Sequence, residues 1–380
     1  MIDSTTSRSP VKNLRRIDLS IKPYMVSDDR IAAWQLANTI IPLIVCCIAL
    51  SHFTQSLSIF SAALSLLFFV LVILFLSRSF SLMHDCGHQS LFRSKSANRV
   101  AAFVLSIFHA MPHYPWSRGH DFHHKYNGNW DRYRGPSALT TVRNYQEKSN
   151  FLKGCYRALR HPVLLFPGGF YYLVIKPRVT LFLGIGEFIV KGLGGKAIEV
   201  ISGRATGSRS FFTRYDSKFF YVKEEAYDAL ANTIVLFGAW YLIGRVIGFW
   251  HFFVLYFLIM SVSAALMIAV FFVQHNFPGS YASDEEKWSY FRGAIEGSSF
   301  LQMPRLLNWF TADIAYHHIH HLSERIPNYR LRACHLANAS KFGSVNRLYL
   351  SQIATCFSFI LWDDERCELV PVSDLGHGCY

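Results

Sequence analysis

The chain has 380 residues, of which 51% are hydrophobic and 17% charged, with a mean hydropathy of +0.20 and a net charge of +13. Soluble globular proteins carry nearer a quarter charged residues, and disordered chains contain fewer aromatic residues than the 16% found here. The composition therefore excludes disordered, collagen-like and disulfide-scaffold proteins, and it favours an integral membrane protein.

Four apolar segments are long enough to cross a membrane as helices, because ~20 residues rising 1.5 Å each cover about 30 Å. Ile31–Ser51, Leu57–Leu76 and Phe249–Val273 contain no charged residue, and Ala229–Ile247 contains only Arg245. Buried helices of a large soluble protein are the alternative, but segments without a polar face disfavour it. The first 30 residues have no apolar core, so we expect no cleavable signal peptide.

The expected fold is an all-α integral membrane protein with four transmembrane helices and a cytoplasmic helical cap. In chain order the predicted parts are an N-terminal cytoplasmic segment (1–30), a first transmembrane hairpin (31–76), the cap (77–228), a second hairpin (229–273) and a cytoplasmic C-terminal region (274–380).

Charge predicts the orientation. Residues 1–30 contain six Lys or Arg, and the short loop 52–56 contains none. Positive charge favours the cytoplasmic side, so both termini and the cap are expected there. The excess of Lys and Arg over Asp and Glu would also favour contact with anionic lipid headgroups. No nucleic-acid-binding motif accompanies it, and we expect no nucleic-acid partner.

The segment Pro162–Val190 is apolar, but Pro167-Gly168-Gly169 and Lys176-Pro177-Arg178 divide it into pieces too short to span a membrane alone. We predict a broken interfacial or re-entrant helix on the cytoplasmic leaflet. The glycine-rich stretch Gly184–Ser210 is predicted to form loop and interfacial helix.

Histidines carry the functional signal, and ten of them fall at four places. They are His84 and His88 (HDCGH, box one); His120, His123 and His124 (HDFHH, box two); His275 (QHN); and His317, His318, His320 and His321 (HHIHH, box three). Roughly 0.03 copies of HxxHH are expected by chance in such a chain, and two are present. The pair of boxes is therefore not accidental.

The spacing within each box directs its imidazoles to one side, because residues i, i+3 and i+4 share a helix face. The helix of Leu57–Leu76 is expected to continue beyond the membrane to box one. His275 lies two residues after Val273, at the end of the last span. With two crossings between them, both sets of histidines emerge on the same side. We therefore predict one cytoplasmic site where these helix ends meet.

So many imidazoles point to metal. Nine candidate histidines are too many for one zinc ion but suit two metals with four or five ligands each. Imidazole binds iron, copper, zinc and nickel, and iron is favoured if the site activates oxygen beside a lipid chain. Nearby carboxylates are expected to orient the ligands through hydrogen bonds and not to bind metal directly. These carboxylates are Asp85, Asp121, Asp313 and Glu324. Asp313 is four residues before His317, so we expect it one helical turn away on the same face.

The motifs HDCGH, WSRGHDFHH and HHIHHLSERIPNYRL resemble the three histidine boxes of the membrane fatty acid desaturases, most closely the acyl-lipid omega-6 (delta-12) type. GNWDRYRG, FFVQHNF and LWDDER extend the resemblance to the C-terminal region. It implies four spans, a cytoplasmic cap, two iron ions, and a cis double bond placed in a lipid acyl chain with O2. The implied ligands are His84, His88, His120, His123, His124, His317, His320 and His321, with His275 as a ninth. His318 falls outside the pattern and is expected to pack or to support a ligand.

The same resemblance implies an apolar tunnel for the acyl chain, and Trp116 and Trp309 beside the boxes could line it. Arg118 and Lys125 could hold a phosphate or carboxyl headgroup, although a solvated basic face would explain them equally well. Phe166, where a fused cytochrome b5 domain would need a haem-binding histidine, precedes Pro167-Gly168-Gly169. We therefore expect a separate electron donor, a ferredoxin or a cytochrome b5.

Two other functions compete with this one. A diiron hydroxylase or ketolase acting on alkyl chains or carotenoids could use the same site, although related alkane hydroxylases tend to carry an HxxxHH box that this chain lacks. A metal transporter would place ionisable residues near the membrane midplane, whereas the four spans contain only Arg245 and His251, both near an end.

Overall fold

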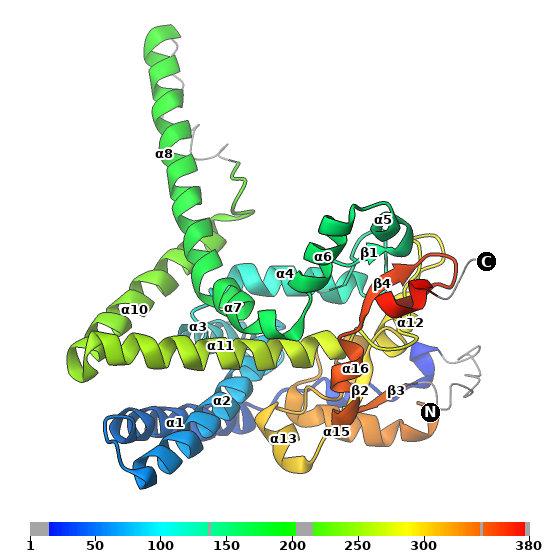
Figure 1. Ribbon diagram of the computed structural model, residues 1–380, viewed down its shortest axis with the longest axis horizontal. Helices are drawn as coiled ribbons and strands as arrows, with labels where there is room; N and C mark the ends of the chain where they lie inside the picture. Colours follow the sequence, from blue (N-terminus) through cyan, green and yellow to red (C-terminus); the bar gives the residue numbers. More distant parts are fainter. Residues whose placement is uncertain (1–14, 136–137, 203–215, 343–344, 377–380) are drawn as a thin grey trace.

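The computed structural model describes residues 15–135, 138–202, 216–342 and 345–376 (Figure 1). Within these residues four helices are long and apolar enough to cross a membrane, as the sequence predicts. They are α1 (Asp29–Phe53), α2 (Ile59–Gly87), α10 (Lys223–Ile247) and α11 (Phe249–Val273).

Each hairpin of long helices begins and turns at recognisable residues. Asp28 caps α1 by accepting hydrogen bonds from the amides of Arg30 and Ile31, and Ser58 caps α2 by accepting from the amide of Ser61. Gly248, with φ of +88°, joins α10 to α11 in a backbone conformation that favours glycine. These turns lie together at one end of the bundle (Figure 1).

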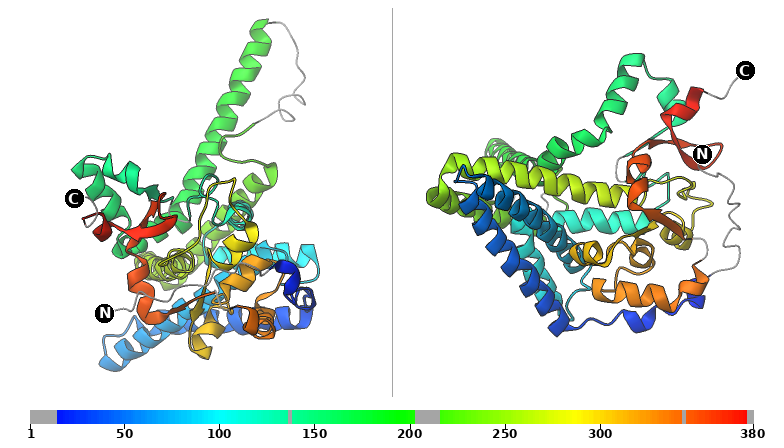
Figure 2. Two further views of the ribbon diagram at one scale, coloured as in Figure 1. Left: turned by 90° about the vertical axis from the view of Figure 1, so that its right-hand side faces the viewer. Right: turned by 60° about the horizontal axis from the view of Figure 1, so that its bottom comes forward.

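The shorter helices are α3 (Lys95–Phe108), α4 (His113–Tyr126), α5 (Val142–Gln146), α6 (Asn150–Leu159), α7 (Leu165–Phe170), α12 (Tyr290–Ile295), α13 (Arg305–Phe310), α14 (His317–Leu322), α15 (Asn328–Ala337) and α16 (Ile353–Cys356). Most of them lie at the opposite end of the long helices, whereas α3 packs along α2 and α7 along α11 (Figures 1 and 2). Buried residues of α2 and α3, among them Leu82, Met83 and Leu105, join Met260 of α11 in one apolar core. This core holds the ends of the long helices against the shorter ones.

The predicted breaks after Pro162 are wrong. Helix α7, a π-helical turn at Tyr171–Ile175 and helix α8 (Lys176–Ser202) follow one another without a loop. Pro167 lies in the first turn of α7, where backbone amides have no helical partner to lose. Pro177 is the second residue after the π-helical turn, close to where the regular i to i−4 bonding is interrupted.

Helix α8 also replaces the loop predicted within Gly184–Ser210, as far as Ser202; the rest of that stretch lies outside the described residues. It is not among the candidate membrane spans. It runs across the direction of α11, which is seen end-on in the left view of Figure 2 while α8 extends upward. An interfacial position for α8 stays a prediction.

Five short strands were not predicted. β1 (Thr140–Thr141) pairs in parallel with β4 (Phe359–Asp363), which pairs antiparallel with β5 (Glu368–Pro371), and β2 (Ser299–Gln302) pairs in parallel with β3 (Asn346–Tyr349). They tie the C-terminal region to the loops around α4 and α14, and the protein remains mostly helical.

Candidate metal centre

Four helix ends bring the histidines together, as the spacing predicts. His84 lies in the last turn of α2, and His88 is its C-cap residue. Box two lies within α4 and box three within α14, while His275 follows the C-cap residue of α11. Each helix therefore presents its imidazoles toward a common interior.

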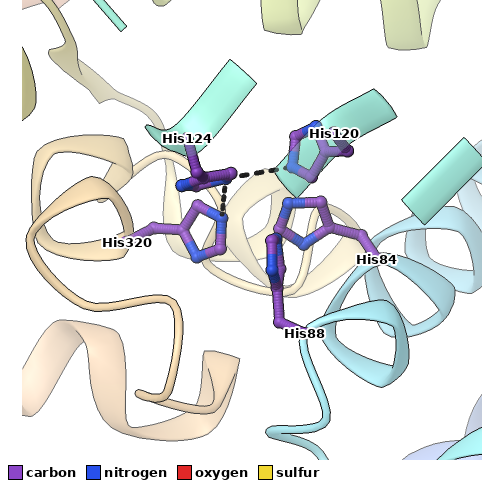
Figure 3. Close-up of side chains that lie close together, drawn as sticks. All are labelled: His84, His88, His120, His124 and His320. Carbon is purple, nitrogen blue, oxygen red and sulfur yellow. Dashed lines mark hydrogen bonds between the residues drawn. The ribbon is translucent and has the colours of Figure 1, made fainter. Parts of the chain in front are cut away.

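Five of these histidines form a group drawn from α2, α4 and α14 (Figure 3). The five-histidine group is His84, His88, His120, His124 and His320, with one ring nitrogen from each lying within 4.8 Å of the others. The Nε2 atom of His124 is 3.0 Å from Nε2 of His120 and 3.0 Å from Nε2 of His320. One nitrogen thus faces two others at hydrogen-bonding distance.

The remaining four candidates form a second group, fully buried, from α4, α14 and the end of α11. The four-histidine group is His123, His275, His317 and His321. Nε2 of His317 lies 2.8 Å from Nε2 of His275 and 3.1 Å from Nε2 of His321. Together the two groups contain the nine histidines predicted as ligands and no further histidine of the described residues.

The tautomers that the surroundings impose suit a cation. A carbonyl oxygen can only accept, so His275 donates from Nδ1 to the carbonyl of Gly297, 2.9 Å away, and keeps a lone pair on Nε2. Nδ1 of His84 faces Oδ1 of Asp85 at 3.3 Å, and its Nε2 is buried with no partner. Nε2 of His88 is likewise buried without a partner. These Nε2 atoms carry a lone pair and no proton, and they point toward one another. A metal ion requires such a set of electron-pair donors.

Burial keeps these imidazoles neutral, because a charged ring loses solvation inside the protein. It lowers the pKa of His275 to about 4. It also lowers the pKa of the other candidate ligands on α4 and α14, helped by repulsion from neighbouring rings. These are His120, His123, His124, His317, His320 and His321. Neutral imidazole is the form that binds metal.

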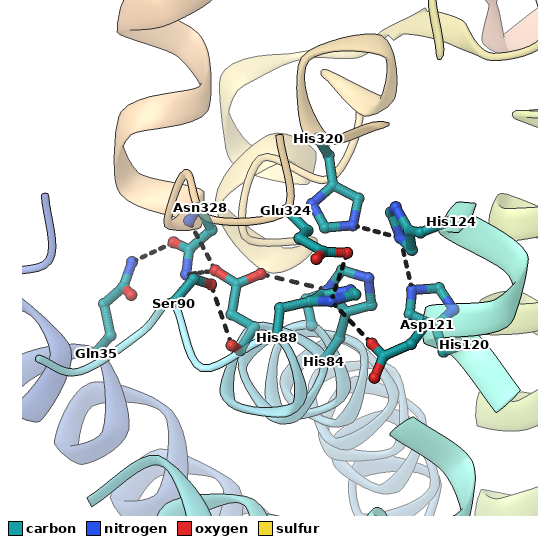
Figure 4. Close-up of polar contacts among 12 residues, drawn as sticks. Gln35, His84, His88, Ser90, His120, Asp121, His124, His320, Glu324 and Asn328 are labelled. Atoms are coloured by element: carbon teal, nitrogen blue, oxygen red, sulfur yellow. Dashed lines mark hydrogen bonds and ion pairs between the residues drawn. The ribbon is translucent and has the colours of Figure 1, made fainter. Parts of the chain in front are cut away.

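Three of the four predicted carboxylates lie beside ligand candidates (Figure 4). Besides facing His84, Asp85 accepts hydrogen bonds from the backbone amide and the side-chain amide of Asn328, at 2.7 and 2.9 Å. Asp121 and Glu324 place carboxylate oxygens 3.4 and 3.5 Å from Nδ1 of His88. This arrangement directs the Nε2 atoms of both box-one histidines away from the acids and into the five-histidine group.

Asp313 does not share a helix face with His317, and that part of the prediction is wrong. Helix α14 begins only at His317, and Asp313 lies in the preceding turn with a left-handed φ of +57°. The charged groups that act on it are Arg332 and Arg78. It therefore belongs to the turn that precedes box three and not to either histidine group.

His318 points away from both groups. Its Nε2 lies 2.9 Å from Nδ1 of His335, and both rings are buried. Phe300 and Phe342 pack against the pair. The contact joins α14 to α15, so His318 packs against the support of box three, one of the two roles expected for it.

The predicted substrate contacts have different surroundings. Trp116 stacks on His120, with ring centroids 4.9 Å apart and planes 10° apart, so it lies at the site. Trp309 instead contacts Arg78, whose guanidinium carbon lies 4.0 Å from the centroid of the Trp309 ring. Lys125 is exposed and lies 5.2 Å from the ring centroid of Tyr126.

Arg118 forms an ion pair with the buried carboxylate of Glu225 and lies over the ring of Tyr221. This pairing uses the charge that was expected to meet a lipid headgroup, and it weighs against that role. The ion pair instead fastens α4 to the first turn of α10.

The sequence analysis did not identify the hydrogen-bonding groups that orient the predicted ligands but lie far from them along the chain. Gly297 supplies only a backbone carbonyl, which no side-chain motif can reveal. Asn328 lies in box three's extended motif, but its contact with Asp85 joins residues far apart in the chain. Gln35 extends this network through a hydrogen bond of 2.8 Å from its amide to Oδ1 of Asn328.

Comparisons with known proteins point in one direction. A family model described as "Fatty acid desaturase" matches residues 60–352. A protein of Bacillus subtilis named "Fatty acid desaturase" is 31% identical over 90% of this chain and 86% of its own length. An "sn-1 oleoyl-lipid 12-desaturase" of Picosynechococcus is 24% identical over 76% of this chain and 72% of its own. An "sn-1 acyl-lipid omega-3 desaturase (ferredoxin)" of Nostoc is 25% identical over 65% and 60%.

Proposed function

Because this chain belongs to the fatty acid desaturase family, we propose that it places a cis double bond in the acyl chain of a membrane lipid, using O2 and electrons from a separate protein. The observation that supports the proposal is the meeting of nine buried imidazoles in two groups at the ends of helices able to span a membrane. A transporter reading has no comparable support, since both groups lie at the helix ends.

We propose two iron ions as the cofactor. The five-histidine group would hold one and the four-histidine group the other, with every ligand a neutral imidazole. Iron bound there would supply the oxidising power needed to remove hydrogen from an unactivated methylene. Asp85, Asp121 and Glu324 are proposed to hold the box-one rings in the ligating tautomer. His318 is assigned a supporting role through His335.

Aromatic residues pack against the histidine groups on the side that we propose faces the membrane, and they would keep water out of the site. Trp116 packs against Phe80, with ring centroids 5.3 Å apart, and Phe271 packs against His84 at 5.8 Å. Aromatic rings here would exclude water from the reacting carbons and position the acyl chain. We propose Trp116 as a substrate contact and retain Trp309 and Lys125 as weaker candidates.

The cap (77–228) and the C-terminal region (274–380) are proposed to face the cytoplasm with both termini, on the charge distribution alone. A soluble donor could then reach the site. The printed name of the Nostoc relative includes ferredoxin, which makes a ferredoxin the first donor to test, with cytochrome b5 second.

The position of the new bond is proposed from the relatives. The Picosynechococcus protein is named for the 12 position of an oleoyl lipid. We therefore propose a delta-12 (omega-6) double bond in a lipid-bound oleoyl chain.

Expression in a host that makes no polyunsaturated lipids tests the function. Mass spectrometry should show lipids that have lost two hydrogens, and chemical location of the bond should find it at the delta-12 position. A gain of one oxygen would instead identify a hydroxylase. The H320A variant removes one proposed ligand and should abolish both bound iron and product. Product formation by this variant at the wild-type rate would contradict the ligand assignment.

A further inference from the structure

A small pocket opens beside the four-histidine group. Its walls come from the loop after α4 (127–135), the segment after α11 (275–282), Gly297 and Leu369 of β5. His275 itself is one of the lining residues. Tyr133, another lining residue, lies with its ring centroid 5.0 Å from that of His123. Two members of the four-histidine group are therefore at the pocket or in contact with its wall.

The pocket lies at the end of the molecule opposite the turns of the two long hairpins. Leu369 of β5 lines it, and β5 pairs with β4, which is seen at this end (Figures 1 and 2). The apolar rings of Phe80 and Trp116 lie instead beside His84 and His120 of the five-histidine group, and Phe271 contacts both groups, through His84 and His317. The pocket and the rings of Phe80 and Trp116 therefore lie beside different histidine groups.

The size of the pocket limits what can enter it. It has about 40 Å³ of space for the centres of water molecules, and one water needs on the order of 10–15 Å³ measured in this way. A few waters fit, and an acyl chain does not. Polar side chains of Asn127, Arg134, Asn276 and Ser280 line it, and apolar or aromatic side chains, among them Trp130, Tyr133, Leu139, Ala282 and Leu369, form the larger part of its wall. Waters there would find the two to four polar partners that they require.

One wall is fixed by the same carbonyl that orients His275. The side-chain amide of Asn127 donates to the carbonyls of Gly293 and Gly297, at 2.7 and 3.1 Å. The side-chain amide of Asn276 donates to the carbonyl of Phe359 at 3.2 Å. These bonds hold the pocket open between three separate parts of the chain.

We propose that this pocket is the aqueous entrance to the four-histidine group, through which water and small anions pass. The inference rests on the proposed function. Desaturation combines two neighbouring methylenes, O2, two electrons and two protons, and it yields the double bond and two waters. In the proposed function the acyl chain lies beside Phe80 and Trp116, so the waters and the protons that they carry need a separate route with polar partners, such as Asn127, Asn276 and Ser280. The pocket is that route.

Small-anion binding tests the route without depending on catalysis. Full-length protein in detergent is loaded with Co²⁺, and the rate of azide binding is followed from the visible spectrum by stopped flow. In A282L a larger apolar side chain fills the pocket, so azide association should slow by about tenfold because the side chain must move first. L369A enlarges the pocket and should speed association.

A333L adds the same side chain at an exposed position of α15, outside the pocket, and should bind azide at the wild-type rate. Wild-type rates in both A282L and L369A would overturn the proposal, since azide would then enter elsewhere. If A282L fails to fold and binds no Co²⁺, L369A alone decides. Failure of the proposed function would appear separately, as wild-type protein that forms no new double bond whatever the azide rates.

Discussion

The rings of His124 and His321 lie stacked, with centroids 4.2 Å apart and planes 18° apart, although each belongs to a different histidine group. The two histidine groups are therefore in direct contact, and metal ions held in them would lie close to each other. We expect the iron-loaded protein to contain two ions per chain, one for each of the two histidine groups. Elemental analysis measures the content, and Mössbauer spectroscopy should show two magnetically coupled sites.

H275A should lower the iron content toward one ion per chain and abolish product, because it removes a ligand from the four-histidine group only. H251A is the matched control. His251 bonds to Thr54 at 3.1 Å in the distant hairpin end and belongs to neither group. A wild-type iron content in H275A would show that His275 is not a ligand.

D85N should weaken iron binding on the order of 10–100-fold, as loss of a partner that orients a ligand does in other metal sites. Asn has one uncharged acceptor oxygen where Asp85 has two charged ones, so it cannot accept from His84 and from Asn328 through separate oxygens, and its own NH2 group would face one of these donors. Competition with a calibrated chelator measures the affinity. D313N is the control, since Asp313 meets Arg332 and Arg78 and should leave the affinity unchanged.

Asp313 should make stability depend on pH. Burial raises its pKa from 3.8 to about 6, and Arg332 and Arg78 only partly oppose this. Between these values the folded protein binds a proton that the unfolded chain does not, so stability should fall as pH rises through this window. D313N should raise the free energy of unfolding at pH 7 by about 1–2 kcal/mol. Asn also tolerates the left-handed backbone at this position.

Thermal unfolding in detergent from pH 4 to pH 7 checks this. The difference in midpoint between D313N and wild type should grow as pH rises. A constant difference across the range would mean that the carboxyl group does not titrate there.

G169A should destabilise the contact between α7 and α11. A Cβ atom at Gly169 would lie 2.6 Å from Cβ of Ala264 and 3.3 Å from its backbone carbon, so the helices must separate. Overpacking of this kind costs about 1–3 kcal/mol. G168A is the control at the next residue, where a Cβ meets nothing within 4 Å. It should leave the unfolding midpoint unchanged or raise it slightly, and an equal loss in both variants would refute the packing argument.

Features with a local period were predictable from the sequence. The HxxHH spacing places imidazoles on one helix face, and the four apolar runs correspond to α1, α2, α10 and α11 because both signals depend only on neighbouring residues. The helical continuation from the second run to His84 is also confirmed, since α2 ends at Gly87. Whether the nine histidines bind iron stays a prediction.

Features that depend on distant contacts were not predictable. The continuous helix through Pro177 needs a π-helical turn before it, which no propensity indicates. β1 has two residues and exists through its pairing with β4, more than two hundred positions along the chain. Asp313 was assigned a helical register, but the backbone there turns left-handed before box three begins.

Helices α4 and α14 each contribute to both histidine groups, whereas α2 and the end of α11 contribute to one group each. Neither group can therefore be completed until α14, close to the carboxyl end, has been synthesised and has folded back onto α4. A chain released early from the ribosome would carry most of the imidazoles and still be unable to form either group. Iron capture would then report that box three had been synthesised and that α14 had folded back onto α4.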